Sequence, residues 1–341
     1  MVKRLWPLVF LCVFLIAGCG GTEEKAHRRN FFAMDTYMTM TAYGGTEAEQ
    51  GLALAERKIR ALESALSVTE TGSDVYLLNH REGGEVLLGK DAAAVLRAML
   101  GVAADTGGAL DPSICPVVTA WGFTSGQPHV PDAESLAESL KKTGWEKIRM
   151  EGNTAVLPEG MEIDLGAAGK GYAGREVGRL LRGAGVRSAI LSLGGNIEAV
   201  GTKPDGSPWQ VGLKAPDADG YAGMLSAENE AVVTSGSYER YFTDEDGRRY
   251  HHILDPATGY PAENGLLSVT VIGKDGLLCD ALSTALFVMG PEKAAEFWRR
   301  HSGFEMILIT AGREILATEG AAARFEAEKR YTEKPVEVIR R

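Results

Sequence analysis

The sequence predicts an α+β fold in a single body. Segments typical of strands and of helices are intermixed along the 341 residues, without the regular strand–helix–strand alternation of a doubly wound sheet. No internal repeat and no linker-like stretch divides the main part of the chain. With 45% hydrophobic and 24% charged residues, the chain can bury a substantial core.

The first residues have the pattern of a bacterial lipoprotein signal. Basic Lys3 and Arg4 precede an apolar run, residues 5–17, which is short for a membrane span. Small residues then lead to Cys19, so we expect residues 1–18 to be a signal peptide and Cys19 to carry the lipid. An uncleaved membrane anchor is the alternative. Both interpretations place the folded part outside the cytoplasmic membrane.

The rest of the chain divides by composition into a tether, a body and a tail. Residues 19–30 are polar and charged, as in a flexible tether. The body covers residues 31–325, and residues 326–341 are expected to form a frayed tail. Lys and Arg total 36 against 46 Asp and Glu, and this net charge of −10 argues against nucleic acid as a partner. It also argues against membrane binding through basic patches, so anchoring would depend on the lipid.

The first half of the body begins with an aromatic- and Thr-rich segment that predicts one strand over residues 31–43. A capping box of Thr46 and Glu49 then starts a helix whose apolar stripe continues to Leu66. The next expected elements are a loop over 67–79, a helix from Asp91 to Gly107, an irregular buried segment over 111–123, a helix over 132–142 and a hairpin over 147–157.

The second half is predicted to contain most of the sheet. β-branched runs and turn residues indicate, in order, a strand over 161–165, a helix to about Arg182, strands over 189–193, 209–214, 231–235 and 267–272, a helix beginning near Asp280, a short helix over 293–301 and a hairpin of strands 306–310 and 314–318.

The stretch from Tyr250 to Gly290 carries the strongest signal for chemistry. Asp280 and Thr284 are four residues apart near a helix start, so their oxygens share one face. A carboxylate and a hydroxyl suit a hard cation such as Mg²⁺. The alternative is that Asp280 only caps the helix. Upstream, His251 and His252 lead into a turn of Asp, Pro, Thr and Gly, and His252 is either functional or an ordinary strand-edge residue.

A glycine-rich turn is the second candidate. Residues 166–171 (GAAGKG) are too short for a P-loop, and Gly171 stands where a P-loop has Ser or Thr. The turn still offers backbone amides to an anion, with Lys170 at a helix start and Asp164 just before it. An ordinary strand-to-helix turn is the alternative.

Cysteine usage excludes a zinc framework and a redox motif. Apart from Cys19 and a cysteine inside the signal, only Cys115 and Cys279 remain, far apart and without a CxxC. They could pair in an oxidising compartment or remain as buried free thiols.

Seven motifs in order resemble the FAD:protein FMN transferases, the ApbE family. They are FAMDT, ALDPSICPVVTAWGF, IDLGAAGKGYA, LSLGGN, VVTSGSYERYF, HHILDPATGYP and CDALSTALFVMG. The resemblance extends from about Phe31 to Thr318. It implies one α+β catalytic body over residues 31–325, with FAD in a cleft and Mg²⁺ at the FAD pyrophosphate.

The resemblance also implies roles for single residues. Asp280, Ser283 and Thr284, with the backbone carbonyl of Ala167, match metal-binding positions, and His252 and Asp280 match catalytic ones. The FAD-contacting positions are matched by Met34, Ala109, Leu110, Asp111, Asp164, Lys170 and Leu254.

The implied activity is Mg²⁺-dependent transfer of FMN from FAD to a Thr or Ser hydroxyl of an extracytoplasmic protein, such as a redox-pump subunit, with release of AMP. FAD hydrolysis to FMN and AMP at the same site is one alternative. A lipid-anchored protein that binds flavin without turnover is another, of a different class.

Overall fold

The computed structural model describes residues 25–331 and 333–341. The expected signal peptide and Cys19 therefore lie outside the described residues. Within the described residues, no helix combines the length and hydrophobicity needed to cross a bilayer.

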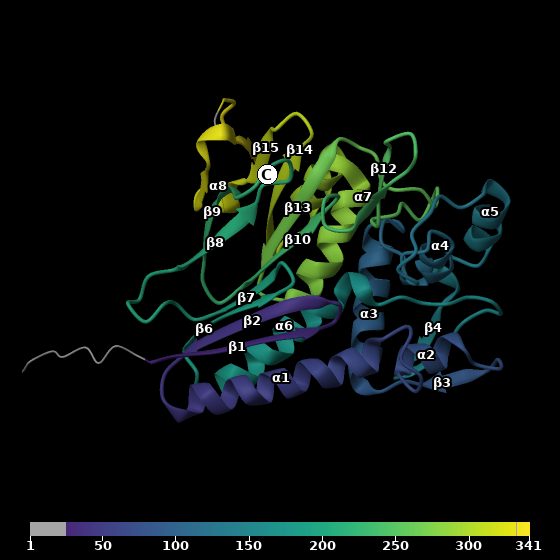
Figure 1. Cartoon of the computed structure of the whole chain (residues 1–341), viewed down its shortest axis with the longest axis horizontal. Helices are drawn as coiled ribbons and strands as arrows, with labels where there is room; N and C mark the ends of the chain where they lie inside the picture. The colour runs from purple at the N-terminus through teal and green to yellow at the C-terminus, as the bar shows by residue number, and fades with distance from the viewer. Residues whose placement is uncertain (1–24, 332) are drawn as a thin grey trace, which may run out of the picture.

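A nine-stranded sheet forms the centre of the molecule (Figure 1). All neighbouring strands are antiparallel except the last pair, β15 and β17. In spatial order the strands are β1 (Ala26–Ala33), β2 (Thr36–Tyr43), β6 (Ser188–Leu193), β7 (Asn196–Val200), β10 (Ala231–Gly236), β13 (Leu266–Gly273), β14 (Phe304–Thr310), β15 (Ile315–Thr318) and β17 (Glu337–Ile339). The α+β prediction is confirmed.

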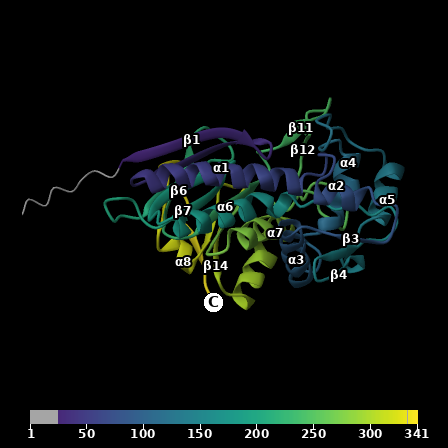
Figure 2. The ribbon, with the colours of Figure 1, turned by 90° about the horizontal axis from the view of Figure 1, so that it is seen from below.

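Long helices cover one face of this sheet. They are α1 (Thr46–Leu66), α6 (Gly166–Gly183) and α7 (Gly276–Arg300), and α3 (Lys90–Asp105) packs against these helices. Figure 2 shows α1, α6 and α7 lying together along the sheet. Their apolar sides and the inward residues of the strands, such as Val269 and Val271, form the main core.

A smaller sheet covers part of the opposite face. It consists of β8 (Trp209–Lys214), β9 (Tyr221–Ala227) and β16 (Phe325–Ala327). Because side chains alternate along a strand, Val232, Ile272 and Ile307 point to this side and pack into a second core with Val211 and Leu213.

The remaining elements gather mainly at the end of the molecule near α3 (Figure 1). Trp121 is fully buried in a third cluster there, and its indole N–H donates to the carbonyl of Gly259 at 2.7 Å. These elements are α2 (Asp74–Asn79), β3 (Glu85–Leu87), α4 (Cys115–Ala120), α5 (Ala133–Lys141), β4 (Arg149–Glu151), β5 (Thr154–Val156), β11 (Tyr241–Thr243) and β12 (Arg249–His251), while α8 (Glu319–Ala322) follows β15.

Helices α6 and α7 approach each other closely at two glycines. A Cβ added at Gly171 would lie 2.0 Å from the carbonyl oxygen of Gly276 and 2.5 Å from the Cβ of Asp280. No other residue fits at position 171 without moving a helix backbone. The start of α7 is thereby held against the N-terminal half of α6.

Three predictions for the first half of the chain are wrong. The strand expected over 31–43 is the hairpin β1–β2, which turns at Met34 and Asp35 with φ of 50° and 56°. The turn lacks the glycine that usually marks this conformation. The expected loop over 67–79 contains α2, capped by Ser73, whose hydroxyl accepts from the amide of Tyr76. The segment 111–123 is largely helical, since Pro112 and Pro116 stand at first-turn positions where proline is tolerated.

Two more expectations fail in the second half, while the helix expected over 293–301 is confirmed as the part of α7 beyond a kink at Gly290, where φ is 80°. Residues 161–165 form no strand and pair with no described strand. The tail expected to fray contains β16 at its start and ends in β17, and the expected tether 19–30 already enters β1 at Ala26. Both end segments have a polar composition, which predicted flexible chain. Strand pairing and burial nevertheless order part of each segment.

We expect Ile339→Ala to lower the free energy of unfolding by about 2–3 kcal/mol, because the side chain is 5% exposed and belongs to the main core. Chemical denaturation of both proteins would measure it. Glu337→Ala, at an exposed position of the same strand, is the control and should change stability by less than about 0.5 kcal/mol. Equal, small effects of the two substitutions would mean that the C-terminal strand is not docked in solution.

Candidate active site

Asp280 is buried on the inner face of α7. The cap of α7 is Asp275, whose carboxylate accepts from the amides of Leu277 at 3.0 Å and Leu278 at 3.4 Å. The alternative that Asp280 caps the helix is therefore wrong. Asp280 is 5% exposed, and its Oδ2 accepts from the amide of Gly171 at 2.7 Å. Burial raises the pKa of Asp280, whereas Lys170 and the amide of Gly171 lower it.

The same amide connects Asp280 with Ala167. In an α-helix the N–H of Gly171 points toward the carbonyl of the residue four positions earlier, which is Ala167. The Asp280 carboxylate and the Ala167 carbonyl therefore meet at one N–H group. Both are hard oxygen donors of the kind that Mg²⁺ prefers.

Three hydroxyl groups extend this oxygen-rich site. The Oγ of Ser235, at the end of β10, lies 2.8 Å from the Oγ of Ser283 and 3.2 Å from the Oγ1 of Thr284. Ser283 is fully buried and donates to the carbonyl of Asp280 at 2.8 Å. Ser283 and Thr284, two of the α7 residues expected from sequence, thus meet at Ser235, one helical turn from Asp280.

The donor chemistry fits a single hard cation. Among the described residues, no three His, Cys, Asp or Glu side chains cluster in a way that could hold a metal, so the fit depends on one carboxylate with hydroxyl and carbonyl oxygens. Such a set suits Mg²⁺, which keeps several waters and shares its ligands with substrate phosphates. Zinc would require His or Cys.

Lys170 lies within electrostatic range of three titratable groups. It lowers the pKa of Asp164, of Asp280 and of His252. Burial acts most strongly on each of them, raising the pKa of the two carboxyl groups and lowering that of the imidazole. Asp164 also accepts from the amide of Gly166 at 2.7 Å, which fixes the entry into α6. A cation among these groups is suited to a phosphate ligand.

His252 is oriented by the chain that precedes it. Its Nδ1 lies 3.1 Å from the carbonyl oxygen of Arg240, and its own amide donates to that oxygen at 3.0 Å. A carbonyl only accepts, so Nδ1 carries the proton and Nε2 remains as an acceptor. Burial lowers the pKa of His252 to about 4, so the ring is neutral near pH 7.

The residues matched to flavin contacts fall into separate groups. Met34 lies beside α6, because a Cβ added at Gly169 would be 3.7 Å from its methyl carbon. The segment of Ala109, Leu110 and Asp111 adjoins Asp164, whose amide donates to the carbonyl of Pro112 at 2.8 Å.

Two of those side chains have structural partners. The Asp111 carboxylate accepts from the amides of Ser113 and Trp145, at 2.8 and 3.1 Å, and from the Ser113 hydroxyl at 2.6 Å. Asp111 therefore holds its own loop. Leu254 packs in the cluster around Trp121.

Sequence reasoning missed Ser235 and Arg240 as site residues. Ser235 lies in a run of small hydroxyl residues that resembles an ordinary turn, and only the pairing of β10 with β13 brings it to α7. The Arg240 carbonyl, which sets the tautomer of His252, is a backbone group that no residue pattern identifies. Cys115 and Cys279 are free and buried, so they are not a disulfide.

Comparison with known proteins gives concordant matches. Residues 34–308 match the model of the ApbE family. An FAD:protein FMN transferase of Klebsiella pneumoniae is 36% identical over 273 residues, which are 78% of this chain and 84% of that protein. One of Treponema pallidum is 31% identical over 340 residues, covering 93% and 94% of the two chains.

The fold agrees with solved structures. The ApbE protein of Thermotoga maritima superposes with a TM-score of 0.79 and 29% identity, over 91% of this chain and 99% of that one. The flavin transferase ApbE of Vibrio cholerae gives 0.77 and 25%, with the same coverage. The family match spans more than half of the chain and includes the glycine-rich start of α6, His252 and Asp280. This protein belongs to the ApbE family.

Proposed function

We propose that this protein transfers FMN from FAD to a Ser or Thr hydroxyl of another protein and releases AMP. The observation that carries the proposal is the buried Asp280 carboxylate, held by the Gly171 amide near Lys170, with the hydroxyls of Ser235, Ser283 and Thr284 gathered one turn further along α7. The relatives from Klebsiella pneumoniae and Treponema pallidum are FAD:protein FMN transferases, which supports the same activity here.

In this proposal Asp280, Ser283, Thr284 and the Ala167 carbonyl would hold Mg²⁺, which would supply positive charge opposite the FAD pyrophosphate. Lys170 adds a second positive charge for the phosphates. The Gly171 amide keeps the Asp280 carboxylate in place. Met34, Asp164, Leu254 and the segment 109–111 bind FAD around it.

The chemical step is a displacement at phosphorus. The acceptor oxygen forms a bond to the phosphorus on the FMN side, and the bond from that phosphorus to the bridging oxygen of AMP breaks. Nε2 of His252 accepts the hydroxyl proton, for which the neutral ring and the fixed tautomer are suited.

We further propose that Cys19 carries the lipid anchor and that the acceptors are extracytoplasmic proteins. The basic, apolar and small-residue pattern of residues 1–19 supports this placement. FAD hydrolysis without an acceptor uses the same groups, with water in place of the hydroxyl. Only the acceptor distinguishes the two activities.

The proposed transfer predicts that an acceptor domain incubated with FAD, Mg²⁺ and residues 20–341 gains the mass of FMN while AMP appears in equal amount. We expect Asp280→Asn to slow both reactions by about 100-fold or more, because the buried carboxylate that would hold Mg²⁺ at the phosphates is lost. Mass spectrometry and chromatography would follow the two products.

Asp275→Asn is the matched control, since Asn caps a helix as well as Asp does. It should keep nearly full activity. AMP and FMN appearing at the same rate with and without acceptor would identify a pyrophosphatase instead. FAD that binds and stays intact in every mixture would identify a flavin-binding protein without turnover.

The low pKa of His252 predicts the pH dependence. The neutral ring is needed as the base, and burial keeps it neutral down to about pH 5. At saturating Mg²⁺ we expect kcat/KM to stay level from about pH 8 to about pH 6 and to fall only as the pH approaches 4. His252→Gln should reduce kcat by about 100-fold and abolish this decline. A fall in kcat/KM near pH 6.5 that is absent in the variant would contradict this prediction, because it would show that burial does not lower the pKa of His252.

A further inference from the structure

Two buried polar side chains on β7 face a small void beside the candidate active site. Asn196 and Glu198 are 4% and 3% exposed, and both point toward α6 because they alternate along the strand. Lys170, Gly171 and Gly276 line the same void, together with the side chains of these two residues. Its volume is about 10 Å³, the room that one water molecule needs.

Each of the two side chains presents an unpaired polar atom. Within the part of the chain that the structure describes, no protein atom forms a hydrogen bond with Glu198 Oε2 or with Asn196 Nδ2. Buried polar atoms in native proteins nearly always have a partner, from the protein or from ordered water. A water between these atoms would satisfy both of them.

Glycines make the room for Glu198. A Cβ at Gly178 would lie 2.5 Å from its Oε1, and one at Gly276 would lie 3.5 Å from its Oε2. A Cβ at Gly174 would lie 3.5 Å from the Cβ of Glu198 and 3.9 Å from Oε2. The carboxyl group is thus enclosed where α6 crosses α7.

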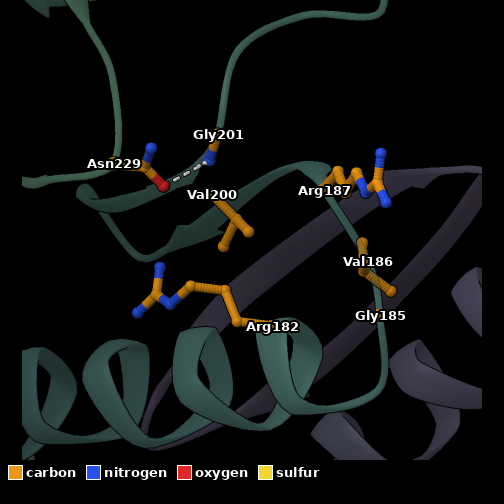
Figure 3. Close-up of a pocket in the computed structure, with 7 residues that line it drawn as sticks. All are labelled: Arg182, Gly185, Val186, Arg187, Val200, Gly201 and Asn229. Atoms are coloured by element: carbon orange, nitrogen blue, oxygen red, sulfur yellow. Dashed lines mark hydrogen bonds between the residues drawn. The ribbon is translucent and has the colours of Figure 1, made fainter.

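The outer oxygen of Glu198 is anchored by Arg182. Its guanidinium lies 3.3 Å from Oε1. Figure 3 shows Arg182 projecting from the last turn of α6 into a surface cavity of about 310 Å³. With Oε1 held from this side, Oε2 is directed inward, toward the void and the active site.

The void adjoins Asp280. Gly171, which lines the void together with Asn196, donates its amide to Asp280 Oδ2 at 2.7 Å. The Asn196 amide also lowers the pKa of the Asp280 carboxyl. An Asn amide carries two hydrogens, so one can point to Asp280 while the other points to a water. A continuous polar path then leads from Arg182 through Glu198, the water and Asn196 to the carboxylate.

We propose that the void binds a water molecule, and that through it Glu198 and Asn196 act as positioning residues for Asp280. The proposal rests on the proposed function of Asp280 as a Mg²⁺ ligand. Partners of metal ligands orient the ligating oxygens, and their loss typically weakens metal binding by about 10- to 100-fold.

The first test compares Glu198→Leu with Glu198→Gln in residues 20–341. We expect Glu198→Leu to raise the Kd for Mg²⁺ at least about 10-fold. Glu198→Gln retains a polar group that can bond the water, and its Kd should stay within about threefold of the parent value. Calorimetric titration with Mg²⁺ alone measures the Kd. The Mg²⁺ concentration that gives half-maximal AMP release from FAD measures how the reaction depends on the ion.

Gly174→Ala tests the water itself. Its added methyl would meet Glu198 and Leu193 at ordinary contact distances of 3.5 and 3.6 Å, so it fits sterically while occupying the void. Alanine also favours a helix over glycine. We therefore expect an unchanged or higher unfolding temperature together with weaker Mg²⁺ binding, a combination that general destabilisation cannot produce.

Glu230→Leu is the matched control. Glu230 is also a buried carboxylate, 6% exposed and paired with an arginine, Arg324, but it lies outside the void. It should lower stability and leave the Kd for Mg²⁺ unchanged. The proposal is overturned if Glu198→Leu and Gly174→Ala both bind Mg²⁺ within about twofold of the parent, or if Glu230→Leu weakens binding equally. Failure of the parent protein to flavinylate an acceptor would instead reject the proposed function, and calorimetry would still report on the void.

Discussion

The contact between α6 and α7 at Gly171 and Gly276 is the constraint on which the site depends. Because neither residue has a side chain, the helices approach until an amide of α6 reaches the carboxylate of Asp280. A larger residue at position 171 would separate them and leave the carboxylate buried without that donor. Glycine at the start of α6 is therefore needed for close helix packing. Such packing requires small residues but does not require the spacing of a P-loop.

The charge of Lys170 affects the pKa of three titratable groups at the site of this acidic protein. Burial favours the neutral forms of Asp164, Asp280 and His252, and Lys170 is the side chain whose charge acts on all three. For the carboxylates its charge opposes the effect of burial. For the imidazole it adds to that effect. One lysine thus favours the ionised form of both carboxyl groups and the neutral form of the imidazole, as metal-assisted phosphoryl transfer requires.

The sequence predicted the α+β class, most strands of the main sheet and the residues of α7 that meet at the site. These follow from periodicity and from motifs within single segments. Strand pairing that depends on distant residues was harder to predict: β17 looks polar by itself and is ordered by Ile339 in the core. Ser235 and the Arg240 carbonyl reach the site only through tertiary structure. The hairpin turn at Met34 was missed because no glycine marks it.

The position of β1 limits how far the folded body could lie from a lipid on Cys19. Ala26, where the sheet begins, lies seven positions after Cys19, and a chain of that length spans at most about 25 Å. If Cys19 is lipidated, the edge of the sheet stays within that distance of the bilayer. The hairpin that carries Met34 starts at this edge. The folded body would then stay beside the bilayer, where acceptor proteins held at the same membrane would meet it at a higher local concentration than those that diffuse freely.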